Sequence, residues 1–221
     1  MNKLCRRLRD GILDILFPTR CVICRRIIPA GKPRICTKCQ DHLPLTPDGG
    51  PQRGDFFSKR ISAVYYEKDM RQAILRYKFS GASSYAHAFG ELTASCIYEN
   101  MDSEYDFITW VPLSKDRKRS RGYDQTQLIA MQAAKKLCRP LKPTLRKRRG
   151  VKPQSKTGSP ERRRANISGA YRVIDPALVA GKRILLIDDI VTSGSTLSEC
   201  AKTLLIAGAE EVLCATLART R

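Results

Sequence analysis

The chain has 221 residues, which is enough for one α/β domain and a small accessory module. Hydrophobic residues make up 42% of the sequence, which excludes a disordered basic chain, and no apolar run reaches the length of a membrane span, about 18 residues. Lys and Arg number 41 against 21 Asp and Glu, so the formal net charge is +20 at pH 7. A charge of this size predicts attraction to a polyanion or to a phosphorylated ligand.

The first 17 residues are basic at their start and carry apolar side chains at helical spacing, namely Leu4, Leu8, Ile12, Ile15 and Leu16. The apolar part is short, contains Asp14 and is followed by no small-residue cleavage site, which makes it a poor secretory signal. We therefore expect residues 1–17 to form an amphipathic helix, and the chain to lie in the cytoplasm, where cysteines stay reduced.

Four of the nine cysteines form two Cys-x-x-Cys pairs separated by 11 residues. Four thiolates turned toward one point satisfy the tetrahedral preference of Zn²⁺ and leave no open position, so a structural rather than a catalytic zinc is expected. The alternative is two disulfides or free thiols. The sequence thus predicts a zinc module over residues 18–50, with Cys21, Cys24, Cys36 and Cys39 as ligands. The other five are expected to be apolar core or helix residues: Cys5, Cys96, Cys138, Cys200 and Cys214.

Residues 51–221 alternate between strand and helix patterns, which predicts an α/β domain with a mostly parallel sheet flanked by helices. Asp124 is the expected N-cap of one helix. The run from Lys78 to Gly81 is interpreted as a helix end closed by glycine, with an anion contact as the alternative. The expected strands are 60–66, 106–111, 182–187 and 211–217, the expected helices are 69–79, 85–100, 124–138 and 195–207, and residues 144–173 are a long polar stretch.

Most of the positive charge lies between residues 114 and 172, where 19 Lys and Arg face three acids, a net +16 of the total +20. A solvated surface is the alternative explanation, but four separate basic clusters favour a polyanion or phosphorylated ligand. Only Tyr123 and Tyr171 are available in this stretch to stack on bases. Contact with a nucleic-acid backbone, with little sequence specificity, is therefore expected.

An apolar strand ends in Asp188 and Asp189, and a small-residue loop, residues 192–196, then runs into a helix. Loop amides, hydroxyls and the helix N-terminus make an anion site. Two carboxylates repel a phosphate but hydrogen-bond well to a pair of sugar hydroxyls. The predicted ligand is a sugar with vicinal hydroxyls and a terminal phosphate, and the alternative is an Asp-Asp turn before an ordinary helix cap.

Residues 184–196 resemble the motif by which type I phosphoribosyltransferases bind phosphoribosyl pyrophosphate (PRPP). Residues 111–125, which end in Arg-Gly-Tyr-Asp-Gln, resemble the ComF subfamily of competence proteins, as do residues 161–171 and the four-cysteine module. The resemblance implies a type I phosphoribosyltransferase-like fold, with Mg²⁺ bound together with PRPP. It implies ribose contacts by Asp188 and Asp189, phosphate contacts by Thr192, Ser193, Gly194, Ser195 and Thr196, and diphosphate or DNA contacts by Arg117, Arg119 and Arg121.

The ComF resemblance implies a protein that binds PRPP and handles single-stranded DNA during natural transformation, in the cytoplasm at the inner-membrane site of DNA import. A second hypothesis is a phosphoribosyltransferase that acts on an unidentified acceptor and releases diphosphate. The sequence identifies no catalytic base, because His87 is expected to be a packing residue, and residues 149–164 take the place of the family's flexible loop. A third interpretation is a partner of the import machinery that docks a helicase or another competence protein through the zinc module.

Overall fold

The structure is a computed structural model that describes residues 18–29, 31–148 and 169–221. The helix expected over residues 1–17 and the flexible loop expected over 149–164 lie outside the described residues. Among the described residues, no helix has the length and apolar character needed to pass through a membrane.

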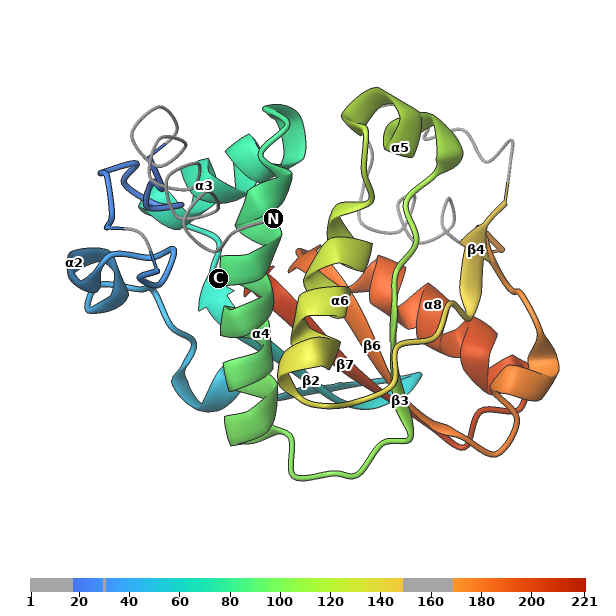
Figure 1. The fold of residues 1–221 in the computed structure, drawn as a ribbon. Helices are drawn as coiled ribbons and strands as arrows, with labels where there is room; N and C mark the ends of the chain where they lie inside the picture. The colour runs from blue at the N-terminus through green and yellow to red at the C-terminus, as the bar shows by residue number, and fades with distance from the viewer. Residues whose placement is uncertain (1–17, 30, 149–168) are drawn as a thin grey trace, which may run out of the picture.

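A five-stranded sheet forms the centre of the fold, in the order β1-β2-β7-β6-β3 (Figure 1). The strands from β2 to β3 are parallel to their neighbours, and β1 pairs antiparallel with β2. The expected α/β class with a mostly parallel sheet is therefore confirmed. The strands are β1 (Gln52–Gly54), β2 (Phe57–Tyr65), β3 (Phe107–Trp110), β6 (Arg183–Val191) and β7 (Glu211–Arg219).

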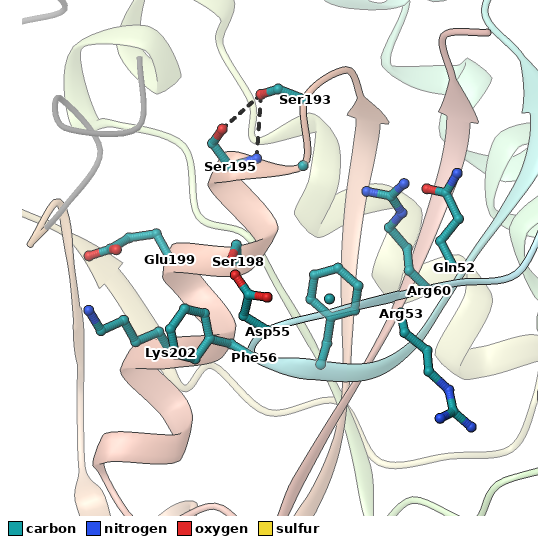
Figure 2. A pocket seen from close by; sticks show the side chains of 13 residues that line it. Gln52, Arg53, Asp55, Phe56, Arg60, Ser193, Ser195, Ser198, Glu199 and Lys202 are labelled. Atoms are coloured by element: carbon teal, nitrogen blue, oxygen red, sulfur yellow. Dashed lines mark hydrogen bonds between the residues drawn. The ribbon is translucent and has the colours of Figure 1, made fainter. Parts of the chain in front are cut away.

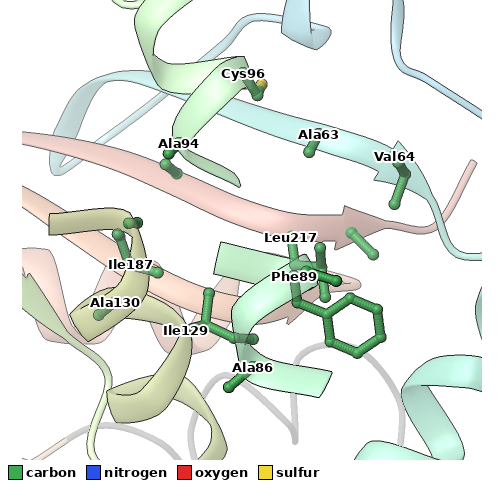
Figure 3. Packing of buried hydrophobic residues seen from close by; sticks show 14 of the residues in the cluster. Ala63, Val64, Ala86, Phe89, Ala94, Cys96, Ile129, Ala130, Ile187 and Leu217 are labelled. Atoms are coloured by element: carbon green, nitrogen blue, oxygen red, sulfur yellow. The ribbon is translucent and has the colours of Figure 1, made fainter. Parts of the chain in front are cut away.

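Helices cover both faces of the sheet, which explains why β6 is apolar without alternation. Leu185 and Ile187 belong to the buried cluster beneath α4 and α6, whereas Ile184 and Leu186 belong to the cluster beneath α8. Figure 3 shows residues of the first cluster, including Phe89 of α4. The main helices are α3 (Lys68–Phe79), α4 (Ala86–Asn100), α6 (Gln125–Lys136) and α8 (Ser195–Ile206).

The cysteine module packs directly against the α/β domain. Val22, Ile23 and Ile35 share one buried cluster with the apolar residues of α3 and α4. Arg76 on α3 holds the module in a second way, since its Nη2 donates to the carbonyl oxygens of Val22 at 2.9 Å and Ile23 at 2.7 Å. The module contains the short helix α2 (Thr37–Gln40) and is followed by the single turn η1 (Pro47–Gly49).

A short helix, α5 (Lys115–Arg121), replaces part of the loop that the sequence predicts after β3. The hydroxyl of Ser114 caps it by accepting from the amide of Arg117 at 3.4 Å, and Gly122 ends it at a φ of 79°. This helix carries Arg117, Arg119 and Arg121, and it lies above the upper end of α6 in Figure 1.

The polar stretch predicted over residues 144–173 contains two short strands at its ends. β4 (Leu145–Lys147) pairs antiparallel with β5 (Tyr171–Val173), and Leu145 and Tyr171 are buried. Their apolar residues are too few to show an alternating pattern in the sequence. The remaining single turns are η2 (Ser83–Tyr85) and η3 (Pro176–Leu178).

Candidate functional site

Asp188 and Asp189 lie inside β6 rather than after its end, because the strand continues to Val191. Asp188 is buried, and its Oδ1 accepts from the amide of Asp189 at 2.8 Å and from the hydroxyl of Thr126 at 3.5 Å. Burial first, and then the Asp189 carboxylate, raise the pKa of Asp188 to about 8. Two adjacent carboxyl groups thus lie in surroundings in which one of them resists ionisation. Such raised pKa values are typical of functional sites that bind polar ligands.

Asp189 has a cationic partner that the sequence analysis interpreted otherwise. The Nζ of Lys78, at the end of α3, lies 2.8 Å from Asp189 Oδ2, and only 17% of the lysine side chain and 14% of the aspartate side chain are exposed. The interpretation of Lys78 as part of a helix end is correct for the backbone but misses this contact. Charge pairing across two distant elements leaves no local pattern, so no signal in the sequence could have found it.

The N-terminus of α6 adds polar groups beside the acid pair. Asp124 is buried and caps this helix as predicted, since its Oδ1 accepts from the amide of Gln127 at 3.1 Å. Its Oδ2 also accepts from the amide of Leu113 at 3.0 Å, which ties the helix to the segment after β3. Burial raises the pKa of Asp124 despite these two hydrogen bonds. Thr126, which sequence reasoning did not single out, contacts Asp188 from the first turn of the same helix.

The predicted phosphate loop follows β6 and leads into α8. Gly194 caps the helix with a φ of 76°, a left-handed conformation that glycine adopts without strain. Ser193 Oγ lies 2.8 Å from Ser195 Oγ, and Thr192 and Ser193 are exposed. The predicted residues 192–196 therefore form a hydroxyl-rich loop and first helical turn at the N-terminus of α8, as an anion site requires.

A pocket of about 460 Å³ opens beside this loop, between α8 and the hairpin of β1 and β2 (Figure 2). Arg60 rises from β2 toward the loop, and a Cβ added to Gly194 would lie only 2.7 Å from its Nη1. Burial lowers the pKa of Arg60, and among the described residues it has no carboxylate partner within ion-pair distance. The lining includes neither Asp188 nor Asp189, so the pocket adjoins the acid pair only through the loop.

The three predicted arginines all lie on α5, but they differ in their surroundings. Arg117 and Arg119 are exposed. Arg121 is half-buried, and its guanidinium lies 4.9 Å from the centre of the Phe79 ring. Burial lowers the pKa of Arg121 first, while the nearby Asp189 opposes this shift.

Lys147 of β4 approaches the same region, because its ammonium lies 5.3 Å from the centre of the Tyr171 ring. Burial, and then Arg117, lower the pKa of this lysine. Neither tyrosine that the sequence offered for base stacking is available. Tyr171 is buried, and Tyr123 packs against Tyr77 at a centroid distance of 5.6 Å.

The four predicted metal ligands are brought together, with all four sulfurs within 4.8 Å of one another. Cys24 Sγ and Cys36 Sγ are 3.7 Å apart, which fits the about 3.8 Å between two thiolates on one tetrahedral zinc. Burial alone raises the pKa of Cys21, but hydrogen bonds from the amides of Cys36 and Cys24 outweigh it and lower the pKa to about 7. Burial and the neighbouring sulfurs raise the pKa of Cys39, so a cation is needed before all four are thiolates.

Two other expectations are wrong. His87 is not a packing residue, because 53% of its side chain is exposed and its Nδ1 lies 3.4 Å from Glu91. Cys138 is exposed with a positive φ just after α6, whereas Cys96, Cys200 and Cys214 are buried as expected. Cys5 lies outside the described residues.

Two family models match the chain: a phosphoribosyl transferase domain over residues 127–221 and a double zinc ribbon domain over residues 12–59. The competence protein ComFC of Streptococcus pneumoniae is 30% identical over 191 residues, which cover 85% of this chain and 78% of that protein. The DNA utilization protein YhgH of Escherichia coli K12 is 28% identical over 228 residues, 93% of this chain and 99% of that protein. Competence protein F of Haemophilus influenzae is 25% identical over 224 residues, with coverage of 92% and 98%.

Proposed function

The chain belongs to the ComF family of competence proteins, and we propose that it binds PRPP at the acid pair and the phosphate loop while it holds single-stranded DNA on its basic face. The proposed setting is the cytoplasm, at the inner-membrane site where DNA enters. The observation that carries the proposal is the acid pair on β6 next to a glycine-capped loop. Carboxylates suit vicinal hydroxyls, and loop amides suit a phosphate.

In the proposed complex, Asp188 and Asp189 accept hydrogen bonds from the ribose hydroxyls, and residues 192–196 hold the 5′-phosphate. Mg²⁺ would enter together with the diphosphate, and the acid pair offers the carboxylate oxygens that this cation prefers. Lys78, which pairs with Asp189, and Arg121, whose pKa the nearby Asp189 raises, would compensate the diphosphate charge. Arg117 and Arg119 are exposed and are better suited to an extended polyanion.

The proposed DNA surface consists of exposed cations on α5 and β5 and on or directly after β4, namely Lys115, Arg117, Lys118, Arg119, Arg146, Arg148 and Arg172. Most of them belong to α5, where none makes an ion pair with an acid among the described residues. Such a surface binds phosphodiesters without reading the bases, and its affinity falls steeply with salt.

The four-cysteine cluster is proposed to hold a structural Zn²⁺, because four sulfur ligands at tetrahedral spacing leave no position for a substrate. The zinc module is also the proposed docking element for a helicase or another competence protein. Its exposed residues Arg25, Arg26 and Lys38 lie on the side of the module that faces solvent.

Phosphoribosyl transfer is the second candidate activity, and the cations around the acid pair favour it. Departure of diphosphate from PRPP leaves negative charge that Lys78 and Arg121 are positioned to stabilise. Diphosphate release from PRPP and Mg²⁺, screened against purines, pyrimidines and single-stranded DNA, tests this activity. Turnover with any acceptor would identify an enzyme, and its absence with all of them would leave PRPP as a bound ligand.

Isothermal titration of the Asp188→Ala, Asp189→Ala double variant with PRPP and Mg²⁺ tests the ribose assignment. We expect binding to be lost while the zinc content stays unchanged, because the cysteine module lies on other elements. Wild-type affinity in the double variant would overturn the assignment.

The DNA surface is tested by replacing Arg117, Arg119 and Arg121 with Ala and measuring single-strand affinity as a function of salt. Each lost phosphate contact lowers the slope by about 0.7, so the slope should fall by up to about 2. The control replaces three exposed cations at or just after the C-terminal end of α6: Lys135, Lys136 and Arg139. Equal slopes for the two triple variants would show that DNA lies elsewhere.

A further inference from the structure

The last turn of α3 contacts four parts of the molecule through four consecutive residues. Arg76 donates to the cysteine module, Tyr77 donates to the carbonyl oxygen of Gln125 at 2.8 Å, Lys78 pairs with Asp189, and the Phe79 ring lies beneath Arg121. The first three side chains are thereby fixed within the fold. Phe79 differs from them because its outward side is not used by any of these contacts.

Phe79 is 66% exposed although Arg121 lies 4.9 Å from its ring centre. One face of the ring is therefore covered by a guanidinium, and much of the remaining ring surface is open to solvent. Tyr98 is the other strongly exposed aromatic residue in the described part of the chain, at 83%, and no cation lies over it there. Phe79 directly follows Lys78, the partner of Asp189, so its exposed ring offers an apolar face to a ligand near the acid pair.

We propose that Phe79 is the stacking platform for one base of the bound single strand. The inference rests on the proposed function, because it adds a base contact to a surface that otherwise grips phosphates. Arg121, which lies over the other face of the ring, strengthens stacking through its positive charge. Its guanidinium can also bind the phosphate that flanks the base. Phe79 lies outside the basic stretch of the sequence, where only Tyr123 and Tyr171 were available, and both of these are occupied by packing.

The charges around Phe79 favour a strand over an isolated base. Asp189 alone would repel a phosphodiester. Lys78 Nζ lies 2.8 Å from this carboxylate and neutralises its charge, so the surface next to Phe79 is not acidic. Arg117 and Arg119 continue the positive surface along α5, beyond the ring. A strand that stacks one base on Phe79 therefore finds cations for its neighbouring phosphates, whereas a free base gains nothing from them.

The experiment compares wild type with Phe79→Ala, Phe79→Trp and, as a matched control, Tyr98→Ala. Each protein is titrated with a fluorescent oligothymidine and with an oligonucleotide of equal length whose residues are abasic. We expect Phe79→Ala to lose roughly tenfold in affinity for the first strand and nothing for the second, since stacking needs a base and phosphate contacts do not. Phe79→Trp should keep wild-type affinity, and Tyr98→Ala should equal wild type on both strands.

Equal affinity of Phe79→Ala and wild type for the oligothymidine would overturn the inference while the proposed DNA binding stands. If wild type binds neither strand, the proposed DNA binding itself fails. The PRPP titration then still tests the proposed PRPP site separately. A third arm uses free 2-aminopurine nucleoside and follows its fluorescence. If the fluorescence of the nucleoside changes in a Phe79-dependent way while Phe79→Ala binds both strands like wild type, the ligand of Phe79 is a free base and not a base of a DNA strand. That result would overturn the inference.

Discussion

Lys78 Nζ and Asp189 Oδ2 are 2.8 Å apart and join the last turn of α3 to the strand that carries the acid pair. Two neighbouring carboxyl groups in a half-buried site repel each other, and one cation between them and solvent lowers that repulsion. Lys78 in fact lowers the pKa of Asp188, against the larger upward effects of burial and Asp189. The lysine thus makes the proton on Asp188 easier to remove.

Replacing Lys78 with Met should weaken PRPP binding about tenfold at pH 7, because the proton that Asp188 already holds at this pH is then bound more tightly and must leave before the ribose and Mg²⁺ are bound. The deficit should shrink toward pH 9, where Asp188 loses its proton more readily in both proteins. Isothermal titration across this pH range measures it, and Lys78→Arg, which keeps the charge, is the control. A deficit that stays constant with pH would instead indicate a direct contact between Lys78 and PRPP.

The raised pKa of Asp188 predicts a pH-dependent cost in stability. The folded protein binds a proton here up to about pH 8, whereas the carboxyl group of the unfolded chain loses it near pH 4. Between these values the folded state holds more protons than the unfolded state, so the free energy of unfolding decreases as the pH rises. Below pH 4 both states are protonated and the cost is absent.

Asp188→Asn removes this cost and should raise the melting temperature in the absence of PRPP. The gain should be small at pH 5 and reach several degrees at pH 8.5, since 1 kcal/mol corresponds to about 2–4 °C for a chain of this size. Asn keeps an oxygen for the amide of Asp189 and the hydroxyl of Thr126. Asp116→Asn on exposed α5 should show no such trend. A gain that is equal at both pH values would refute the burial argument.

The parallel sheet, its helices, the cysteine cluster and the loop after Asp189 could all be predicted, because each rests on a local pattern. Continuous apolar residues indicate a strand buried on both faces, and Asp124 before an amphipathic run indicates a helix cap. Paired Cys-x-x-Cys motifs likewise converge through their spacing alone.

What the sequence could not indicate are contacts between distant elements. Lys78 reaches Asp189 across 111 positions, and Arg60 reaches the phosphate loop from another strand. Tyr171 lies in a polar stretch, yet the β4–β5 pair buries it, while Phe79 ends an amphipathic helix and stays exposed. Burial of a single side chain depends on its tertiary neighbours, and these are not encoded in a short window of sequence.

Gly194→Ala should weaken PRPP binding by about tenfold. An alanine at a φ of 76° is strained by about 1–2 kcal/mol, and its Cβ would lie 2.7 Å from Arg60 Nη1, so the guanidinium or the loop must shift. Gly181 is the matched control, because it has a φ of 65° but its Cβ would meet nothing within 4 Å. Both variants should melt at a similarly lowered temperature. A comparable loss of PRPP affinity in Gly181→Ala would show that general destabilisation, rather than the loop, is responsible.

Loss of zinc should weaken PRPP binding, although the four cysteines do not touch the acid pair. Without the metal, the backbone of residues 21–24 is no longer fixed, and Arg76 loses the carbonyl oxygens of Val22 and Ile23. Arg76 stands two positions before Lys78 on α3, so the lysine that pairs with Asp189 is then less firmly held. Cys36→Ser should accordingly lose zinc, melt at a lower temperature and bind PRPP several-fold more weakly.

Cys138→Ser is the control for that variant, because Cys138 is an exposed cysteine outside the cluster. It should retain zinc, stability and PRPP affinity. Arg76→Met distinguishes loss of the metal from loss of the contact between the cysteine module and α3. It removes the two hydrogen bonds to the module and leaves all four ligands in place. We expect this variant to keep its zinc and to show the same several-fold loss of PRPP affinity as Cys36→Ser. Wild-type PRPP affinity in Arg76→Met would mean that the module does not act on the acid pair through α3.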